Sequence, residues 1–227
     1  MNPNKAFLFV NGEVRNMACL RAQIHEGDML VAVDGGLNHL LEMGLTAQFL
    51  IGDLDSITRE QEEQAIAAGS QVIRFPPEKD ETDLELALDF VVKRGCDEIC
   101  VAGGLGGRLD QTLGNIYLLT RPNLEQCDIR IDDGVDEVII LRNEVEINGS
   151  EDDIVSLLPI SEQVRGVRTE KLKYPLTAET LYRDHTRGIS NVMESNLARV
   201  RIESGILLCI HSRVGLLKGI SGGYYGK

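Results

Sequence analysis

The feature that most constrains the fold of this chain is a change of hydrophobic pattern near residue 128. Before that point, short apolar runs indicate strands at about 6–10, 29–33, 48–51, 71–75 and 98–102. They alternate with helical patterns at about 36–43, 58–69, 82–94 and 109–120. Such alternation predicts βαβ units, and therefore a mainly parallel sheet with helices on its faces.

Beyond residue 128 the apolar runs are short, close together and separated by turn residues. They lie at 129–132, 137–140, 145–147, 154–158, 198–203 and 206–210, with no convincing helix between them. This pattern is typical of a small antiparallel sandwich or barrel. We therefore expect an α/β protein with an N-terminal three-layer α/β domain over residues 1–130, followed by a C-terminal antiparallel β-sandwich over 131–215. Residues 216–227, rich in Gly and Tyr, are expected to form a flexible tail.

The composition is that of a soluble globular protein. The chain has 227 residues, of which 43% are hydrophobic and 26% charged. No apolar run approaches the roughly 20 residues that span a bilayer, and the N-terminal run is too short for a signal peptide. The five cysteines contain no C-x-x-C pair, so neither a zinc site nor a disulfide framework is indicated. We expect reduced thiols, a cytoplasmic location and no membrane partner.

The net charge of −13 disfavours a nucleic-acid partner, because a phosphate backbone would be repelled. The charge is unevenly distributed, with 10 Lys and Arg against 21 Asp and Glu in residues 1–128, and 13 against 15 in the remainder. The acidic excess therefore lies in the part predicted to be α/β. A cationic substrate would be attracted there, whereas a phosphorylated one would need metal ions to bridge the two sets of oxygens.

Two aspartates mark the end of the third predicted strand. Asp53 and Asp55 follow an apolar run and Gly52, and alternation along extended backbone would aim both side chains to the same side. Two like charges so close repel each other, and a hard divalent cation with oxygen ligands relieves the repulsion. The alternative is a solvated pair of aspartates at a strand end. Asp34 repeats the arrangement, since it follows the apolar run 31–33 and precedes two glycines.

Two further segments carry charged residues at helix starts. Residues 78–83 open a helical pattern for which Thr82 or Asp80 is the expected N-cap. Residues 103–110 place four glycines, a cation and a carboxylate between a strand and a helix. This segment matches neither common nucleotide loop, but its backbone amides and Arg108 could bind phosphate, with Lys79 as a second cation. The alternative is a flexible connection. All these segments follow strands or begin helices, so they should meet at one edge of the sheet.

The ordered set of motifs resembles the thiamine pyrophosphokinase family. The motifs are Asp34-Gly35-Gly36, Gly52-Asp53-Leu54-Asp55-Ser56, Lys79-Asp80-Glu81-Thr82-Asp83, Gly104 to Arg108 with Asp110, Leu172 to Leu176, and Gly188-Ile189-Ser190-Asn191. The resemblance covers about residues 5–212. It implies transfer of a diphosphoryl group from ATP to the hydroxyl of thiamine, which gives thiamine diphosphate and AMP. It also implies a catalytic ATP- and Mg²⁺-binding α/β domain, a thiamine-binding β-sandwich, and a homodimer with active sites between subunits.

The resemblance assigns roles to particular residues. Mg²⁺ would be held by Asp53, Asp55 and Asp83, with Asp34 close by. The ATP phosphates would be bound by Lys79, Thr82, Arg108, Gly104, Gly106 and Gly107, with Arg108 also stabilising charge in catalysis. Asp80 or Asp110 would orient or deprotonate the attacking hydroxyl, and the choice between them stays open. Thiamine would contact Tyr174, Ser190 and Asn191.

The chain departs from the family pattern at one motif. Gln111 stands where the family often has His, so a titrating role at that position is not expected. The chain also has no Trp, which leaves Tyr174 as the stacking residue.

Three rival functions remain. One is a diphosphokinase for another heterocyclic alcohol, such as a hydroxymethylpterin. The second is a thiamine- or nucleotide-binding protein without catalysis. The third is a metal-dependent phosphohydrolase, although the sequence has no His-rich cluster.

Overall fold

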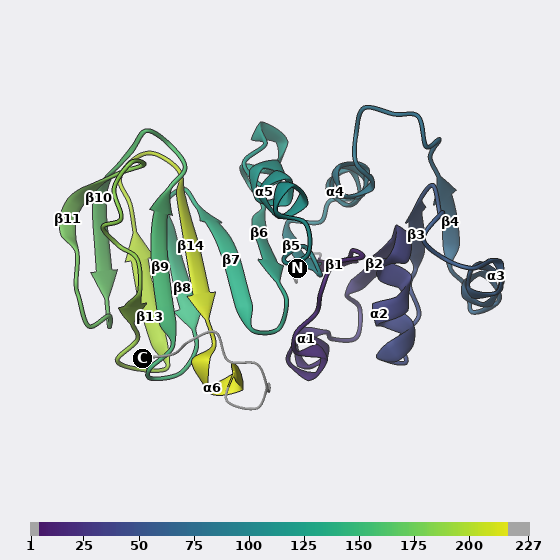
Figure 1. Ribbon diagram of the computed structural model, residues 1–227, viewed down its shortest axis with the longest axis horizontal. Coiled ribbons are helices and arrows are strands. Elements are labelled where there is room, and N and C mark those ends of the chain that lie inside the picture. The colour runs from purple at the N-terminus through teal and green to yellow at the C-terminus, as the bar shows by residue number, and fades with distance from the viewer. Residues whose placement is uncertain (1–4, 218–227) are drawn as a thin grey trace. The chain divides into compact units, whose positions relative to one another are not determined.

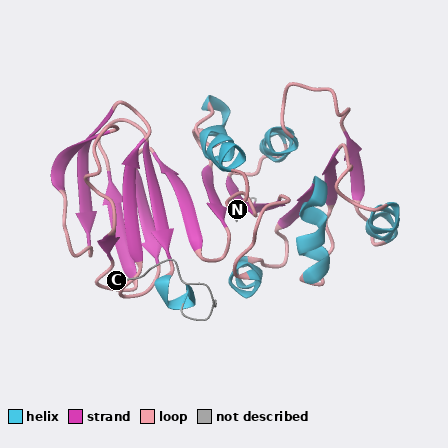
Figure 2. Ribbon diagram, in the orientation of Figure 1, coloured by secondary structure: helices cyan, strands magenta, loops and turns pink. Residues whose placement is uncertain are grey.

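The computed structural model describes residues 5–217 and divides into two compact units, residues 1–134 and 135–227 (Figures 1 and 2). Most of the predicted flexible tail, residues 218–227, lies outside the described residues. The described part of the tail is the end of a short helix, α6 (Val214–Leu217). Among residues 5–217, no helix combines the length and the apolar character that crossing a membrane requires.

The first unit is built on a parallel sheet. Its strands are β1 (Lys5–Phe9), β2 (Met29–Val33), β3 (Phe49–Gly52), β4 (Gln71–Arg74), β5 (Glu98–Ala102) and β6 (Asp128–Asp132). They lie in the order β6-β5-β1-β2-β3-β4, and every neighbouring pair is parallel. The helices are α1 (Met17–Gln23), α2 (Leu37–Glu42), α3 (Arg59–Ala67), α4 (Asp83–Lys93) and α5 (Leu109–Leu118).

Apolar side chains on alternate strand positions hold the three layers together. One face of the sheet packs against α1, α2 and α3 through a buried cluster that includes Phe7, Phe9, Leu20, Leu40 and Ala65. Helix α4 lies on the other side of the sheet, with its Leu84, Ala87, Leu88 and Val91 buried (Figure 1). Each fully buried Leu, Val or Phe side chain stabilises the fold by about 1.5–3 kcal/mol relative to exposure.

Two local details differ from the sequence prediction. Helix α1 was not predicted, because its seven residues carry one buried side chain, Leu20, and therefore no periodic apolar pattern. Its start is instead defined by Asn16, whose side chain accepts a hydrogen bond from the Cys19 amide. Strand β6 was grouped with the antiparallel strands but pairs parallel with β5. The apolar pattern of a strand does not show whether its neighbour in the sheet runs parallel or antiparallel to it.

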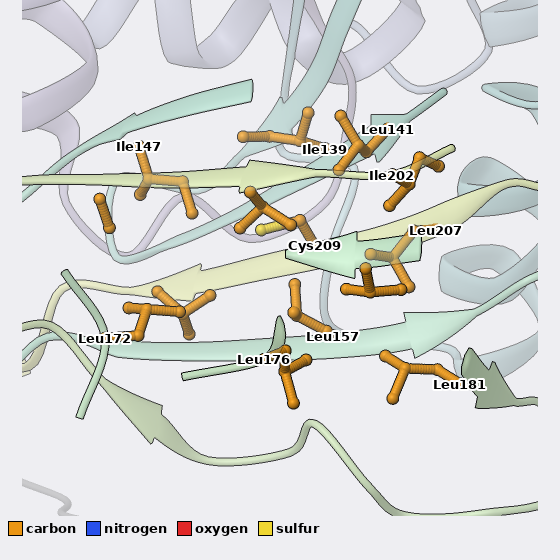
Figure 3. Close-up of a cluster of buried hydrophobic side chains, with 14 of the residues drawn as sticks. Ile139, Leu141, Ile147, Leu157, Leu172, Leu176, Leu181, Ile202, Leu207 and Cys209 are labelled. Atoms are coloured by element: carbon orange, nitrogen blue, oxygen red, sulfur yellow. The ribbon is translucent and has the colours of Figure 1, made fainter. Parts of the chain in front are cut away.

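The second unit is an antiparallel sandwich. Its strands are β7 (Asp136–Leu141), β8 (Glu144–Asn148), β9 (Ile154–Pro159), β10 (Gln163–Glu170), β11 (Thr177–Tyr182), β12 (Asn191–Val192), β13 (Leu197–Arg201) and β14 (Leu207–Ser212). One layer has the order β12-β9-β14-β7 and the other β11-β10-β13-β8. Side chains from both layers form one buried cluster, which includes Ile139, Ile147, Leu157, Leu181 and Cys209 (Figure 3). The predicted fold class, an α/β domain followed by an antiparallel β-sandwich, is confirmed.

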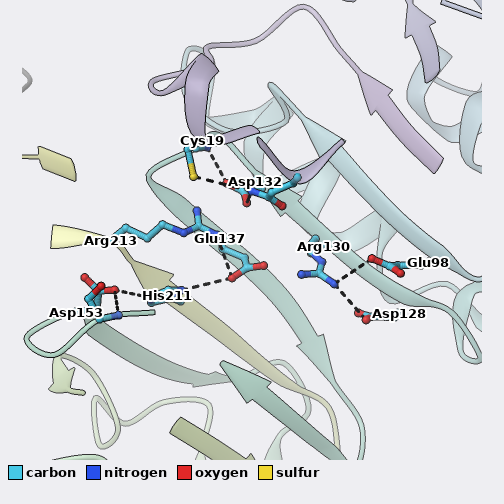
Figure 4. A network of polar contacts seen from close by, with 12 residues as sticks. Cys19, Glu98, Asp128, Arg130, Asp132, Glu137, Asp153, His211 and Arg213 are labelled. Carbon is cyan, nitrogen blue, oxygen red and sulfur yellow. Dashed lines mark hydrogen bonds and ion pairs between the residues drawn. The ribbon is translucent and has the colours of Figure 1, made fainter. Parts of the chain in front are cut away.

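A buried polar cluster closes one end of the sandwich. His211 is fully buried between two carboxylates, with Nε2 3.1 Å from Asp153 Oδ2 and Nδ1 3.4 Å from Glu137 Oε2 (Figure 4). Asp153 also accepts hydrogen bonds from the amides of Ser150 and Val214. Because buried charges are costly without partners, this cluster ties the turn before β9 to strands β7 and β14.

Candidate active site

The candidate active site lies at the carboxyl edge of the parallel sheet in the first unit. The chain runs from β1 outward through β2, β3 and β4, and then places β5 and β6 on the other side of β1. The loops after β1 and β5 therefore diverge, which is where ligands bind in open α/β sheets. A cavity of about 540 Å³ lies here, lined among others by the residues that follow β1, β2 and β5.

Three of the predicted metal ligands come together at this edge. Carboxylate oxygens of Asp34, Asp53 and Asp55 all lie within 4.8 Å of one another. Asp34 Oδ1 is buried and has no hydrogen-bond partner among residues 5–217. Three carboxylates that share one point, one of them with a buried unpaired oxygen, match the oxygen-only coordination that Mg²⁺ and Ca²⁺ prefer.

The fourth predicted ligand, Asp83, approaches the same point from the start of α4. A Cβ placed on Gly52 would lie 3.2 Å from Asp34 Cβ and 3.3 Å from Asp83 Oδ1. Gly52 also has a φ of 146°, which side chains rarely adopt. Glycine is thus required at the end of β3, because two aspartates converge there.

The closeness of Asp53 and Asp55 has a different cause from the one predicted. Strand β3 ends at Gly52, and Leu54 adopts a φ of 67°. The Asp55 amide donates to Asp53 Oδ1 over 3.2 Å. A turn, and not alternation along a strand, therefore brings the two carboxylates together. Leu54 is buried in the unit's core and anchors this turn.

The start of α4 places one cation beside the carboxylates. Lys79 Nζ lies 3.0 Å from Asp83 Oδ1, an ion pair that is not aligned as a hydrogen bond. Lys79 Nζ also donates a hydrogen bond to the Pro76 carbonyl over 3.2 Å. Thr82 is the N-cap, since its hydroxyl accepts from the Glu85 amide over 3.2 Å. Asp80 is exposed and is not among the residues that line the cavity.

The glycine loop after β5 forms the opposite wall. Gly104, Gly106 and Asp110 line the cavity, whereas Gly107 and Arg108 do not. The Arg108 guanidinium binds Asp110 through two hydrogen bonds, of 3.1 Å from Nε and 2.6 Å from Nη2. These bonds lower the pKa of the Asp110 carboxyl and raise the pKa of Arg108. Asp110 is therefore held ionised at neutral pH.

The residues predicted to contact thiamine lie together in the second unit. Tyr174 is 56% exposed, and its main chain is held by Asn191, whose Oδ1 accepts from the Tyr174 amide and whose Nδ2 donates to the Tyr174 carbonyl. Ser190 is exposed, with a φ of 60° and its amide bonded to Ser156 Oγ. Asn191 itself is buried, so its amide group is engaged in holding the loop that carries Tyr174.

Each of the two units matches a known sequence family. The profile described as "Thiamin pyrophosphokinase, catalytic domain" matches residues 20–131, and "Thiamin pyrophosphokinase, vitamin B1 binding domain" matches residues 140–207. The chain belongs to the thiamine pyrophosphokinase family. The first match falls within the α/β unit and the second within the sandwich.

Individual family members are similar over most of the chain. A thiamine pyrophosphokinase of Bacillus subtilis is 32% identical over 189 residues, which are 82% of this chain and 88% of that protein. The crystal structure of a Bacillus subtilis thiamine pyrophosphokinase matches with a TM-score of 0.82 at 29% identity, covering 92% of this chain and 99% of the other. A Geobacillus thermodenitrificans thiamin pyrophosphokinase matches with a TM-score of 0.77 at 30% identity, covering 91% and 96%. The predicted family is confirmed.

Several residues that line the cavity were not predicted. Asn11 and Gly12 follow β1, and His39 Nε2 lies 2.9 Å from the Gly12 carbonyl. The signal was available, because an apolar strand followed by Asn-Gly repeats the pattern seen after β2 and β3. Thr112 and Asn115 also line the cavity from α5. No local pattern marks these two, since their role depends on contacts with the glycine loop.

Proposed function

We propose that the cavity binds ATP and that the chain catalyses the reaction of its family on thiamine. The hydroxyl oxygen of thiamine attacks the β-phosphorus of ATP, and the bond from that phosphorus to the α,β-bridging oxygen breaks. Thiamine diphosphate and AMP are the products, and the proton of the hydroxyl is released. The observation that carries this proposal is the group of three aspartates within 4.8 Å, set at the edge of a cavity walled by a glycine loop. Such transfers are catalysed mostly by positioning and charge neutralisation.

We propose that Asp34, Asp53, Asp55 and Asp83 hold Mg²⁺. The fit rests on donor chemistry, because all donors are carboxylate oxygens and Asp34 Oδ1 is buried without a partner in the described chain. When bound, Mg²⁺ would neutralise charge on the phosphate oxygens, which is what an acidic crevice needs to accept a triphosphate.

Cations and amides would bind the rest of the triphosphate. Lys79 lies beside Asp83 and can move from it to a phosphate oxygen. Arg108 is 71% exposed in its ion pair, so its guanidinium can also reach a ligand. Thr82 uses its hydroxyl oxygen as a cap and keeps its hydrogen to donate. The amides of the loop that contains Gly104, Gly106 and Gly107 supply further donors.

Of the two candidate carboxylates for the attacking hydroxyl, we propose Asp110. It lines the cavity, whereas the exposed Asp80 does not. Its lowered pKa keeps it ionised, so it accepts a hydrogen bond from the hydroxyl and orients the oxygen for attack. Gln111, which also lines the cavity, has no titrating group and offers hydrogen bonds alone.

Thiamine would bind through the second unit. The exposed ring of Tyr174 offers a stacking surface, and Ser190 an exposed hydroxyl. Asn191 acts by holding the main chain of Tyr174 through two hydrogen bonds of 2.9 and 2.7 Å. The aminopyrimidine and thiazolium rings suit an aromatic platform and an acidic surrounding.

Replacing Tyr174 with Ala removes the stacking surface. The change is expected to raise KM for thiamine about tenfold and to leave KM for ATP unchanged. The reason is that an aromatic contact contributes on the order of 0.5–1.5 kcal/mol beyond area burial. Steady-state kinetics with each substrate varied in turn measures this. Tyr182→Ala is a matched control, since Tyr182 is 46% exposed on the same unit but lies on β11. An unchanged KM for thiamine would move the stacking residue elsewhere.

We further propose a cytoplasmic homodimer with active sites at the subunit interface. Helix α5 has no buried residue, and its Leu109, Leu113 and Tyr117 are 72%, 45% and 60% exposed. A spacing of four residues puts these side chains on one face, which is an apolar stripe suited to a partner subunit.

The proposed cytoplasmic location rests on the cysteines. All five are free thiols, which suits a reducing compartment. The net charge of −13 argues against nucleic acid and anionic membranes as partners.

One assay tests the function. Purified protein is incubated with ATP, Mg²⁺ and thiamine, and AMP and thiamine diphosphate are quantified by chromatography. Equal amounts of both products are expected. AMP formed only with a hydroxymethylpterin would indicate the related diphosphokinase. Free phosphate or ADP would indicate hydrolysis or transfer of a single phosphoryl group, and binding without products would indicate a non-catalytic protein.

A further inference from the structure

Two side chains of α5 hold the glycine loop by its carbonyl groups. Asn115 Nδ2 donates to the Gly104 carbonyl over 2.9 Å, and Thr112 Oγ1 donates to the Gly106 carbonyl over 3.1 Å. Both side chains line the cavity. They are three residues apart, so they project from the same face of the helix. We propose that Thr112 and Asn115 are positioning residues that aim the loop's amides at the phosphates of ATP, an inference that rests on the proposed function.

The geometry of the peptide bond connects the carbonyls to the amides. In a planar trans peptide, the carbonyl of one residue and the N–H of the next point in opposite directions. Fixing the carbonyls of Gly104 and Gly106 therefore fixes the N–H groups of Leu105 and Gly107. In residues 5–217, neither of these two amides donates to a backbone carbonyl. Two such amides, held in place and donating to no backbone carbonyl of the described residues, can donate to an anion.

The far end of the loop depends on the Thr112 hydrogen bond to Gly106, because packing does not fix that end. A Cβ on Gly103 would lie 2.6 Å from the Val10 carbonyl, and one on Gly104 would lie 2.8 Å from the Ile131 side chain. The start of the loop is thus fixed by its neighbours. A Cβ on Gly107, by contrast, would meet nothing within 4 Å. An unheld glycine segment loses much conformational freedom when it orders around a ligand, and prior ordering removes that cost from binding.

The turn that follows α5 provides a matched control for the loss of such a hydrogen bond. Thr120 Oγ1 donates to the Tyr117 carbonyl over 2.7 Å, just beyond the end of α5. Thr120 does not line the cavity. Thr120→Val and Thr112→Val therefore remove the same chemical contact, a hydroxyl bonded to a carbonyl, with the same change of side-chain shape. They differ in whether the carbonyl belongs to the loop.

The test uses the full chain and measures kcat, KM for ATP and KM for thiamine, together with inhibition by inorganic triphosphate as a probe of the anion site. Thr112→Val is expected to raise KM for ATP and the inhibition constant of triphosphate about three- to tenfold, the usual worth of one hydrogen bond. Asn115→Ala should raise both constants by a smaller factor, because packing against Ile131 also holds Gly104. Asn115→Asp should be worse than Asn115→Ala, because a carboxylate repels both the Gly104 carbonyl and the phosphates. KM for thiamine should change less than twofold in all three.

Two comparisons separate positioning from general stability. Thr112→Ser keeps the hydroxyl and should restore most of the affinity for ATP. Thr120→Val should lower the melting temperature as much as Thr112→Val does, but leave KM for ATP unchanged. The inference is wrong if Thr112→Val raises KM for ATP no more than Thr120→Val does, or raises KM for thiamine equally.

The failure of the proposed function has a different signature. If the unmodified chain forms no thiamine diphosphate, triphosphate binding measured by calorimetry still compares Thr112→Val with Thr120→Val. Equal triphosphate affinity in these two variants would overturn the inference. Should Asn115→Ala fail to fold, the two threonine variants carry the same test alone.

Discussion

At the scale of single residues, the aspartates of the proposed metal site differ in burial, and this predicts an uncommon effect on stability. Asp34 Oδ1 is buried and unpaired within the described chain, close to Asp53 and Asp55. Without a cation, the ionised carboxylates repel one another. Asp34→Asn is therefore expected to raise the melting temperature of the metal-free protein while abolishing most of kcat.

Thermal unfolding with and without Mg²⁺ measures both parts of this prediction. The unmodified chain should gain about 2.7 kcal/mol when Mg²⁺ is present at 100 times its dissociation constant, and Asp34→Asn should gain much less. Asp55→Asn should likewise lose most of kcat with its fold intact. Glu81→Gln, an exposed carboxylate in the neighbouring loop, is the control. Equal stabilisation of Asp34→Asn and the unmodified chain by Mg²⁺ would remove Asp34 from the site.

The pair of Arg108 and Asp110 predicts a pH dependence. Hydrogen bonds from Arg108 are the largest cause of the lowered pKa of Asp110. A lowered pKa keeps the carboxylate ionised as pH falls, until the pH passes below the usual range of Asp. Activity that needs ionised Asp110 should therefore persist into acid, and Arg108→Gln should move the acid limb of kcat/KM to higher pH. If the acid limb of kcat/KM stays at the same pH in Arg108→Gln, a group other than Asp110 is responsible for it. Because the pair is exposed, its effect on stability should be small.

At the scale of secondary-structure elements, two glycines predict opposite effects on stability. Gly36 is the N-cap of α2 and lies so close to β1 that a Cβ there would be 1.8 Å from the Phe9 carbonyl. Gly36→Ala must separate helix from strand, and we expect a loss on the order of 3 kcal/mol or more. Gly114 lies in the middle of α5, where a Cβ would meet nothing within 4 Å. Gly114→Ala should stabilise the fold by up to about 1 kcal/mol.

Urea unfolding followed by circular dichroism measures both changes in the free energy of unfolding. Gly36→Ala and Gly114→Ala control for each other, because both add the same methyl group and only the surroundings of the two glycines differ. A destabilised Gly114→Ala would mean that α5 does not have the open surroundings described. A Gly36→Ala variant as stable as the unmodified chain would mean that α2 can move from β1 at little cost.

At the scale of the whole molecule, the apolar stripe on α5 predicts the oligomeric state. Leu113→Glu puts a charge in the middle of the stripe and should convert the proposed dimer into a folded monomer with greatly reduced activity. Ile66→Glu is the matched control, since Ile66 is 50% exposed on helix α3 and Leu113 is 45% exposed on α5. Light scattering coupled to size exclusion measures the mass. A Leu113→Glu variant that remains dimeric, or an unmodified chain that is monomeric, would contradict the proposal.

Much of the fold was predictable because the burial pattern is local. The strands ending at Phe9, Val33, Gly52 and Ala102 were located from apolar runs, and the long helix α4 from its periodicity. The family was recognisable from the order of its motifs. Helix α1 was missed because its short length hides its period. Strand β6 was misgrouped because the apolar pattern of a strand does not show whether its neighbour is parallel or antiparallel.

Some residues of the candidate site could likewise be predicted from the sequence, and others could not. Asp34, Asp53 and Asp55 could be named as candidate ligands because each stands beside a strand end that the sequence reveals, whereas Asp83 was named from the resemblance to the family. The roles of Asn115, Thr112 and Asn191 were not predictable, because each bonds a backbone group from a distant part of the chain. The preference for Asp110 over Asp80 likewise came from which of the two lines the cavity.

By itself, the amino-acid sequence determined the fold class, the family and the residue types gathered at the strand ends, since these follow from periodicity, turn chemistry and motif order. Only the tertiary structure decided which of those residues share one point in space and which side chains hold the loops around them. The physical reason is that hydrogen bonds and packing between remote segments depend on distances of a few ångströms. Local patterns along a chain carry no information at that scale.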